Sequence, residues 1–310
     1  MLTPNLVSNR PPLYSIFFIL LSVFVGVVAG SWLGRDIISS FYDGDLLNDV
    51  QNIEQHPEAI RPLIGLQAFA TLIGFIIVPL IYLTAFERKP LAAFFPSQKK
   101  IFLILVLTLA LGLTFMISIS PLVEWNMHVE FPEFLKGFER WARETEDRTA
   151  ELTKAMTTFG SRTDLLIGII VIALLPAIGE ELVFRGLFQN EFFRATGNAH
   201  LAIWFSAIIF SAIHFQFYGF VPRLLLGALF GYLYYWSGNL LVPMFAHFFN
   251  NAFGVIMIYL HQHKITDLNV EDNTAAPLQY VFLNAALTVG LLYYIWKHYR
   301  ELPERPTNAL

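Results

Sequence analysis

Two adjacent glutamates inside an apolar stretch, Glu180 and Glu181, are the residues of this chain best suited to chemistry. They stand in the run Leu-Leu-Pro-Ala-Ile-Gly-Glu-Glu-Leu-Val-Phe-Arg, which ends at Arg185. Burying a charge in hydrocarbon is costly, so ionisable residues in such segments usually mark a site, a pathway or a structural pair. Two like charges side by side increase that cost. The doublet therefore predicts chemistry inside a membrane.

The spacing of the acids relative to Arg185 suggests different roles for them. Glu181 and Arg185 are four residues apart, so they share one helix face with the acid on the N-terminal side, the favourable order. That pairing leaves Glu180, roughly 100° around the helix, without a partner. An unpaired carboxylate in a low-dielectric cleft suits a general base. The alternative is that all three residues only hold helices together; we favour it for the pair but not for the doublet.

Two further motifs lie on later apolar segments. Phe210-x-x-x-His214 carries a histidine that, taken alone, is more often a hydrogen-bonded packing residue than a catalytic one. His247 and Asn251 are one turn apart and face the same way, so an imidazole and an amide converge on one point. Such a pair can stabilise an oxyanion, or it can form hydrogen bonds between helices.

The elements that must position these residues are membrane helices. Of the 310 residues, 55% are hydrophobic and 14% are charged, which excludes an ordinary soluble domain. Only helices satisfy their backbone in lipid without closing a barrel. The expected fold is therefore all-α, a polytopic bundle of about eight transmembrane helices in one domain, 1–310. The apolar runs lie near 14–33, 63–86, 101–123, 164–182, 201–218, 222–236, 239–260 and 277–296.

Eight spans place both termini on one side of the membrane. Arg10, the basic loop 87–100, and Lys297, Arg300 and Arg305 then share one face, which the positive-inside rule makes cytoplasmic. The net charge of -4, without a basic block among aromatic residues, disfavours a nucleic-acid partner. The bilayer and a peptide or membrane protein are the expected partners, and the oligomeric state stays open.

Two segments are too polar to be spans. Residues 34–62 are acidic and consistent with an external loop. Residues 124–163 carry charges of both signs, while Phe134, Phe138 and Trp141 recur at helical spacing, which indicates an amphipathic interfacial helix. For this segment we favour a surface hairpin with no catalytic part.

Other residues near the motifs bear on the shape of the helices, and the absence of certain motifs disfavours several classes of hydrolase. Pro176 and Gly179 precede the acids and can kink or open the helix. Arg223 follows Pro222 at the start of a span, where we expect it to snorkel to the interface. The chain has no cysteine and no His-Glu-x-x-His, Gly-x-Ser-x-Gly or phosphate-loop motif. These absences disfavour thiol, zincin-type and serine hydrolases.

The three motifs, in this order on successive apolar helices, resemble the CPBP family of intramembrane endopeptidases, which includes CAAX proteases and bacteriocin-processing enzymes (Abi-like). The resemblance covers about residues 164–260, the expected catalytic core. It implies hydrolysis of a peptide bond in a membrane cavity, with Glu180 as general base for a water that His214 also holds. His247 and Asn251 would stabilise the oxyanion, and Glu181 and Arg185 would organise the site.

The resemblance leaves the metal and the function class open. Glu180, His214 and His247 are the candidate ligands if Zn²⁺ is used, but a glutamate-activated water needs no metal, and we expect no cofactor. A proton-coupled transporter is one alternative, and a non-proteolytic scaffold or immunity factor is another. A compact member of this kind is more similar to the prokaryotic branch, which implies the cytoplasmic membrane.

The depth of the two key residues in the membrane is a difficulty for this hypothesis. If the spans 164–182 and 201–218 are simple antiparallel crossings, Glu180 lies near the cytoplasmic end and His214 nearer the opposite end. To share one water, the helices must be shifted, or residues 186–200 must form a kinked or re-entrant helix.

Overall fold

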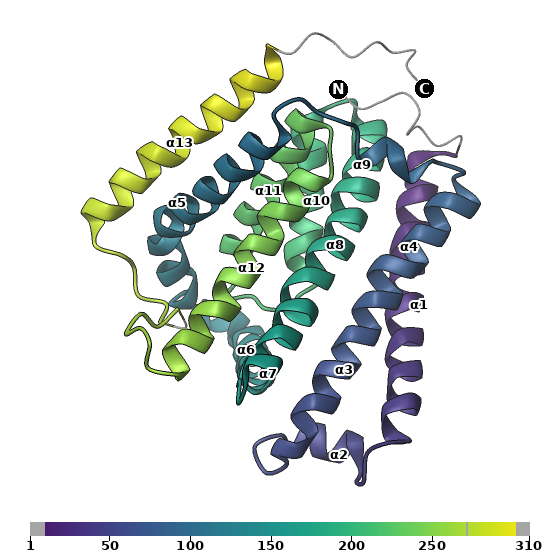
Figure 1. The fold of residues 1–310 in the computed structure, drawn as a ribbon, viewed down its shortest axis with the longest axis vertical. Coiled ribbons are helices and arrows are strands. Elements are labelled where there is room, and N and C mark those ends of the chain that lie inside the picture. The colour runs from purple at the N-terminus through teal and green to yellow at the C-terminus, as the bar shows by residue number, and fades with distance from the viewer. Residues whose placement is uncertain (1–9, 271, 302–310) are drawn as a thin grey trace.

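Figure 1 shows the computed structural model, which describes residues 10–270 and 272–301. All regular secondary structure in these ranges is helical, so the predicted all-α membrane bundle is confirmed. Six helical stretches are long and apolar enough to cross a membrane. They are Pro12–Ser39, Pro57–Phe86, Ile101–Met127, Arg162–Thr196, Leu241–Gln262 and Leu278–Arg300.

Two of these six stretches alternate α-helix with π-helix. The first holds η2 (Pro57–Ala59), α3 (Ile60–Thr71), η3 (Leu72–Ile77), α4 (Val78–Ile81) and η4 (Tyr82–Phe86). The other holds α7 (Arg162–Gly168), η7 (Ile169–Leu174), α8 (Leu175–Glu181), η8 (Leu182–Phe188) and α9 (Gln189–Thr196). In each, a π-helical segment, η3 or η7, comes just before a proline, Pro79 or Pro176. The wider turn absorbs the hydrogen bond that proline cannot make, so both stretches remain continuous.

The remaining long helices complete the bundle. They are α1 (Pro12–Ser39), α5 (Ile101–Met127), α12 (Leu241–Gln262) and α13 (Leu278–Arg300). The two polar segments form α2 (Leu46–Gln51) and the predicted amphipathic helix, α6 (Lys136–Met156), which follows the 3-10 turn η6 (Glu133–Leu135). The basic loop 87–100 holds another 3-10 turn, η5 (Leu91–Phe94).

Two of the eight predicted spans fall outside those six. The run near 201–218 ends early as α10 (Ala199–Ala212), whose 14 residues reach about 21 Å, less than the roughly 30 Å of a hydrocarbon core. The run near 222–236 is α11 (Phe220–Ser237), which packs against α10. Because these two neighbours run up and down as a pair, the start of α1 and the end of α13 lie at the same end of the bundle (Figure 1). Arg305 lies outside the described residues.

The α1 helix lies unusually close to α3 and η3 because glycines line the contact. A Cβ atom on Gly30 would lie 2.6 Å from the carbonyl oxygen of Phe69, and one on Gly74 would lie 2.8 Å from the backbone nitrogen of Val27. Small residues that let backbones approach are a common basis of helix association in membranes.

We expect Gly30→Ala to lower the free energy of unfolding by about 1–3 kcal/mol, because the added methyl group forces the Phe69 backbone to move. Gly290→Ala in α13 is the matched control, since no atom lies within 4 Å of the Cβ it would add. Thermal unfolding of both variants in detergent checks this. Equal melting temperatures for the two would contradict the close contact.

Candidate active site

Glu180 lies within a helix of 35 residues, Arg162–Thr196, and not near the end of a span. The expected boundary near 182 is wrong because the polar residues that follow do not face lipid. Arg185, Gln189 and Glu191 are all buried within the protein, so the helix continues past them as η8 and α9.

The chain turns at Gly197, which lies midway in sequence between Glu180 and His214. Gly197 adopts the left-handed conformation, with φ of 65°, that favours glycine at the end of a helix. Since α10 returns beside α9 and η8, His214 comes back toward Glu180. The His214 and His247 rings both contact Phe210, and Glu180 lies 4.0 Å from His247. This hairpin removes the difficulty of depth, and no re-entrant helix is needed.

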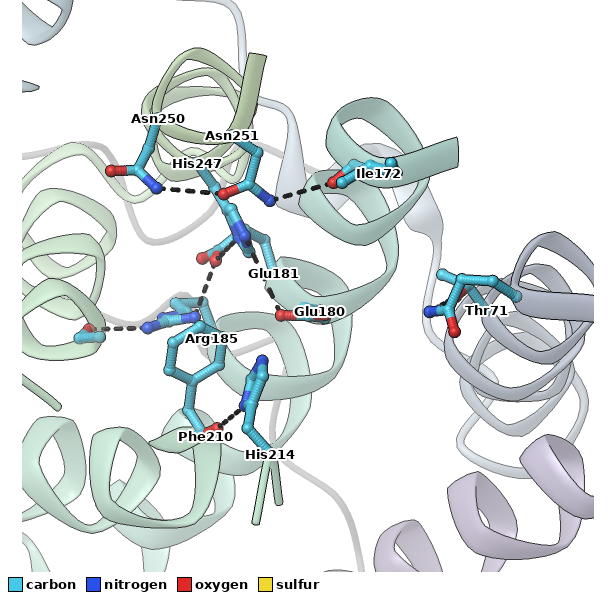
Figure 2. A network of polar contacts seen from close by, with 12 residues as sticks. Thr71, Ile172, Glu180, Glu181, Arg185, Phe210, His214, His247, Asn250 and Asn251 are labelled. Carbon is cyan, nitrogen blue, oxygen red and sulfur yellow. Dashed lines mark hydrogen bonds and ion pairs between the residues drawn. The ribbon is translucent and has the colours of Figure 1, made fainter. Parts of the chain in front are cut away.

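Glu181 joins two helices through one oxygen. Its Oε1 accepts hydrogen bonds from Arg185 Nη1 at 2.7 Å and from His247 Nδ1 at 2.8 Å (Figure 2). The side chains of Glu181 and Arg185 are 0% exposed, so the predicted i,i+4 pair is present and fully desolvated. A buried carboxylate with two charge-capable donors fixes both of them in place. The pair therefore sets the orientation of the His247 ring.

Arg185 is itself held from three sides. Its Nη2 donates a 2.7 Å hydrogen bond to the carbonyl of Gly227 in α11. Its guanidinium lies 4.7 Å from the ring centre of Phe210 and 5.5 Å from that of Phe230. Aromatic faces attract a cation, especially one removed from water. Arg185 thus links η8 to α10 and α11 while it neutralises Glu181.

Glu180 is the acid left without such a partner. Its Oε2 atom is buried and has no hydrogen-bond partner within the described part of the chain, as is also true of Glu181 Oε2. The Oε2 atom of Glu180 lies 4.0 Å from His247 Nε2, and its side chain is 14% exposed. That separation is too long for a direct hydrogen bond but suits one bridging water.

His214 presents a hydrogen-bond acceptor to the same region. Its Nδ1 lies 2.8 Å from the carbonyl oxygen of Phe210, so Nδ1 must carry the proton and Nε2 the lone pair. The rings of His214 and His247 both stand edge-on to the Phe210 ring, with centroids 5.4 and 5.9 Å away. In Figure 2, Glu180 lies between the levels of the two histidines.

Asn251 is held by a backbone carbonyl of η7, in the turn before Pro176. Pro176 has no N–H, so the carbonyl of Ile172, four residues earlier, lacks its α-helical donor. Asn251 Nδ2 donates to this oxygen at 3.4 Å, and Asn251 Oδ1 accepts from Asn250 Nδ2 at 3.1 Å. The second Nδ2 hydrogen of Asn251 remains for another acceptor. The structure thus places Asn251 one turn above His247 (Figure 2).

The 213–219 loop, which carries His214, is braced by residues that sequence reasoning did not select. Asn126, at the end of α5, donates to the carbonyl of Phe217 and accepts from the backbone N–H of Val221. Glu146 of α6 accepts from the backbone N–H of Tyr218 at 3.2 Å. Burial raises the pKa of this carboxyl.

The α6 helix is therefore more than the surface hairpin favoured above, because it packs against the loop of His214. The signal for this contact was in the sequence. Glu146 follows Phe138 and Ala142 at four-residue spacing, on the face that turns inward. Phe138 stacks edge-on against Phe217 of the loop, with centroids 5.7 Å apart.

The donor atoms of the site do not form a metal centre in this conformation. Among the described residues, three donors within 4.8 Å of one another occur in Asp49, His56 and Glu58, at the turn after α2. Glu180, His214 and His247 form no such group, so they do not fit Zn²⁺, which needs ligands at about 2.0–2.2 Å, without moving together.

Comparison with known proteins identifies the segment that holds this site. Residues 162–253 match the family model of Rce1-like type II CAAX prenyl endopeptidases. This segment is similar to that family. The match is consistent with the CPBP resemblance, and every candidate residue from Glu180 to Asn251 lies inside it.

One curated protein is similar to part of this chain. YpbD, an uncharacterized protein of Bacillus subtilis (strain 168), is 38% identical over 88 residues, which are 27% of this chain and 42% of YpbD. No solved structure matches. The matched family is described as endopeptidases, and the match together with several helices long and apolar enough to span a membrane supports an integral membrane protein.

Proposed function

We propose that this protein is an intramembrane endopeptidase that hydrolyses a peptide bond close to the membrane, with Glu180 as the general base. The observation that carries the proposal is the unpaired, buried Oε2 of Glu180 at 4.0 Å from His247 Nε2, beside a Glu181 whose Oε1 is already held by Arg185 and His247. A base must be free to accept a proton, whereas an acid in an ion pair is not. Glu181 is paired with Arg185 and its side chain is 0% exposed, whereas the side chain of Glu180 is 14% exposed and can be reached by a water.

The reaction begins with a water held between Glu180 and His214. One water hydrogen goes to Glu180 Oε2, and the other is accepted by Nε2 of neutral His214. As the oxygen attacks the carbonyl carbon of the substrate, Glu180 takes the proton and a tetrahedral oxyanion forms. Glu180 then returns the proton to the leaving amine as the C–N bond breaks, which restores the carboxylate.

His247 and Asn251 stabilise the oxyanion in this proposal. His247 Nδ1 already donates to Glu181, so Nε2 donates only when the ring carries a second proton. In the proposed mechanism the ring carries that second proton when the oxyanion forms. Asn251 adds its second Nδ2 hydrogen. Donors fixed in advance are worth about 10²–10³ in rate.

The other functions considered lack a comparable observation. A proton-coupled transporter also uses buried carboxylates and histidines, but the match over the site is to a family described as endopeptidases. A scaffold or immunity factor needs no unpaired carboxylate beside a histidine. For location we propose the cytoplasmic membrane of a prokaryotic cell with both termini in the cytoplasm. The basic Arg10, Lys297 and Arg300 at the same end of the bundle support that orientation.

The test is cleavage by the purified protein in liposomes. The probe is a quenched, prenylated peptide with a CAAX sequence, chosen from the description of the matched family, with product mass read by spectrometry. A single internal cut that Glu180→Gln abolishes supports the proposal. Proton or solute flux without a cut would instead favour the transporter.

Removing metal should leave the activity unchanged, since the donors of the site do not form a three-ligand group. We expect the purified enzyme to hold far less than one zinc per chain and to keep its rate in a strong chelator. Zinc content by mass spectrometry and the rate before and after chelation check this. A chelated enzyme that is inactive and regains activity with Zn²⁺ would contradict it.

A further inference from the structure

Arg223, at the start of α11, is a shielded cation without a counter-ion. Its Nη2 donates to the amide oxygen of Gln216 at 2.7 Å, whereas its Nη1 is buried and has no hydrogen-bond partner in the described ranges. No carboxylate oxygen of those residues forms an ion pair with it within 4.0 Å. The expected snorkelling to the interface is therefore not what the structure has.

The guanidinium lies next to the proposed reaction centre. Gln216 belongs to the 213–219 loop, two residues after His214. A Cβ atom on Gly219 would lie 3.0 Å from Arg223 Nη2 and 3.6 Å from Nη1, so the guanidinium rests on this glycine. Glu146, which accepts a 3.4 Å hydrogen bond from Gln216 Nε2, and then Glu180 attract Arg223 only over a longer distance. Arg223 thus lies beside the histidine loop and within the field of the proposed base.

A partner of this kind orients the cation without neutralising it. The side-chain amide of Gln216 fixes the direction of the guanidinium but carries no charge. A buried cation that lacks a counter-ion is costly, and a cation kept for structure alone gains far more from a carboxylate. The guanidinium fork matches a carboxylate through two parallel hydrogen bonds. The unpaired Nη1 is one of the donors for that contact.

We propose that Arg223 binds a carboxylate of the substrate and so selects peptides that carry one near the scissile bond. This inference rests on the proposed function, because it names a substrate group for the same site. The carboxylate belongs to the peptide C-terminus or to an acidic side chain close to it. Arg223 is partly exposed, so an incoming group can reach the guanidinium.

Binding and cleavage of matched peptides test the proposal. The probes are one prenylated CAAX peptide as the free acid, the same peptide as its C-terminal amide, and that amide with an aspartate at the last position. Wild type should favour the free acid over the plain amide by about 10–100-fold in kcat/KM, mostly through KM, the range for a hydrogen bond to a charged group. If the amide that ends in aspartate is cut as efficiently as the free acid, Arg223 recognises an acidic side chain of the substrate as well as a C-terminal carboxylate.

Arg223→Gln should abolish the preference, so that kcat/KM for the acid falls to the value for the amide. Arg223→Lys keeps the charge and should restore part of the preference. Arg61→Gln, an exposed arginine paired with Asp164, is the matched control and should change nothing. The inference is overturned if wild type cuts the acid and the amide with equal kcat/KM. It is also overturned if a folded Arg223→Gln protein loses kcat/KM equally on both peptides.

Binding to Glu180→Gln separates this inference from the proposed function. Fluorescence anisotropy of labelled acid and amide peptides in liposomes needs no turnover. If neither form is ever cut but the acid still binds 10-fold or more tightly, the protease proposal fails and the carboxylate site stands. If both bind equally while the wild type cuts them, the carboxylate site fails and the protease stands.

Discussion

Glu180→Gln is expected to reduce the rate of peptide cleavage by at least about 10³-fold. A glutamine cannot accept the proton of water, and general base catalysis contributes 10²–10⁴-fold by itself. The loss should fall on kcat with little change in KM, because the carboxylate acts on the water and not on the bound peptide. Single-turnover cleavage in liposomes measures it.

Two controls make this result specific to the base. Glu144→Gln removes an exposed glutamate of α6 and should leave the rate as it is. Glu180→Asp keeps the carboxylate but withdraws it by one methylene, so it should retain more activity than glutamine does. A Glu180→Gln protein that is folded and cuts within 10-fold of wild type would remove Glu180 from the mechanism.

The pairing within the motif could be predicted from spacing alone. Glu181 and Arg185 meet because residues four apart share a helix face, and this holds wherever the helix lies. The hydrogen bond between Glu181 and His247 could not be predicted, because it depends on how α12 packs against α8. Periodicity determines the face of a residue, but not its partner on another helix.

The lengths of the helices were harder to predict than their existence. Hydropathy ends the span near 182 because it treats Arg185, Gln189 and Glu191 as exposed, whereas the bundle buries them. Hydropathy also extended α10 by several residues, since the 213–219 loop still holds Ile213, Phe215 and Phe217. Gly197 was the useful signal, as a glycine that ends one helix and lies midway between the two site residues.

Arg223 shows the same limitation for a single charge. At the start of an apolar run, an arginine that reaches lipid headgroups and one that turns into the bundle have the same sequence pattern. What distinguishes them is the hydrogen bond to Gln216. This residue lies seven positions earlier in the chain, and the loop brings its side chain back to the start of the helix. Only the fold places the two side chains together.

Arg185→Leu is expected to have the largest effect on stability of any substitution in the site, about 3–5 kcal/mol. It leaves Glu181 buried without a counter-charge, and removing one member of a buried ion pair costs that much. The carbonyl of Gly227 also loses its donor. The melting temperature in detergent, together with the fraction of monodisperse protein, measures the loss.

The double variant Glu181→Leu/Arg185→Leu distinguishes charge from structure. Replacing both members removes the unpaired charge, so we expect stability to recover by at least half relative to Arg185→Leu. Activity should stay absent, because His247 Nδ1 loses the acceptor that orients its ring. If the double variant is as unstable as the single one, the ion pair is not the source of the cost. If it cleaves peptide at the rate of wild type, Glu181 has no part in holding His247.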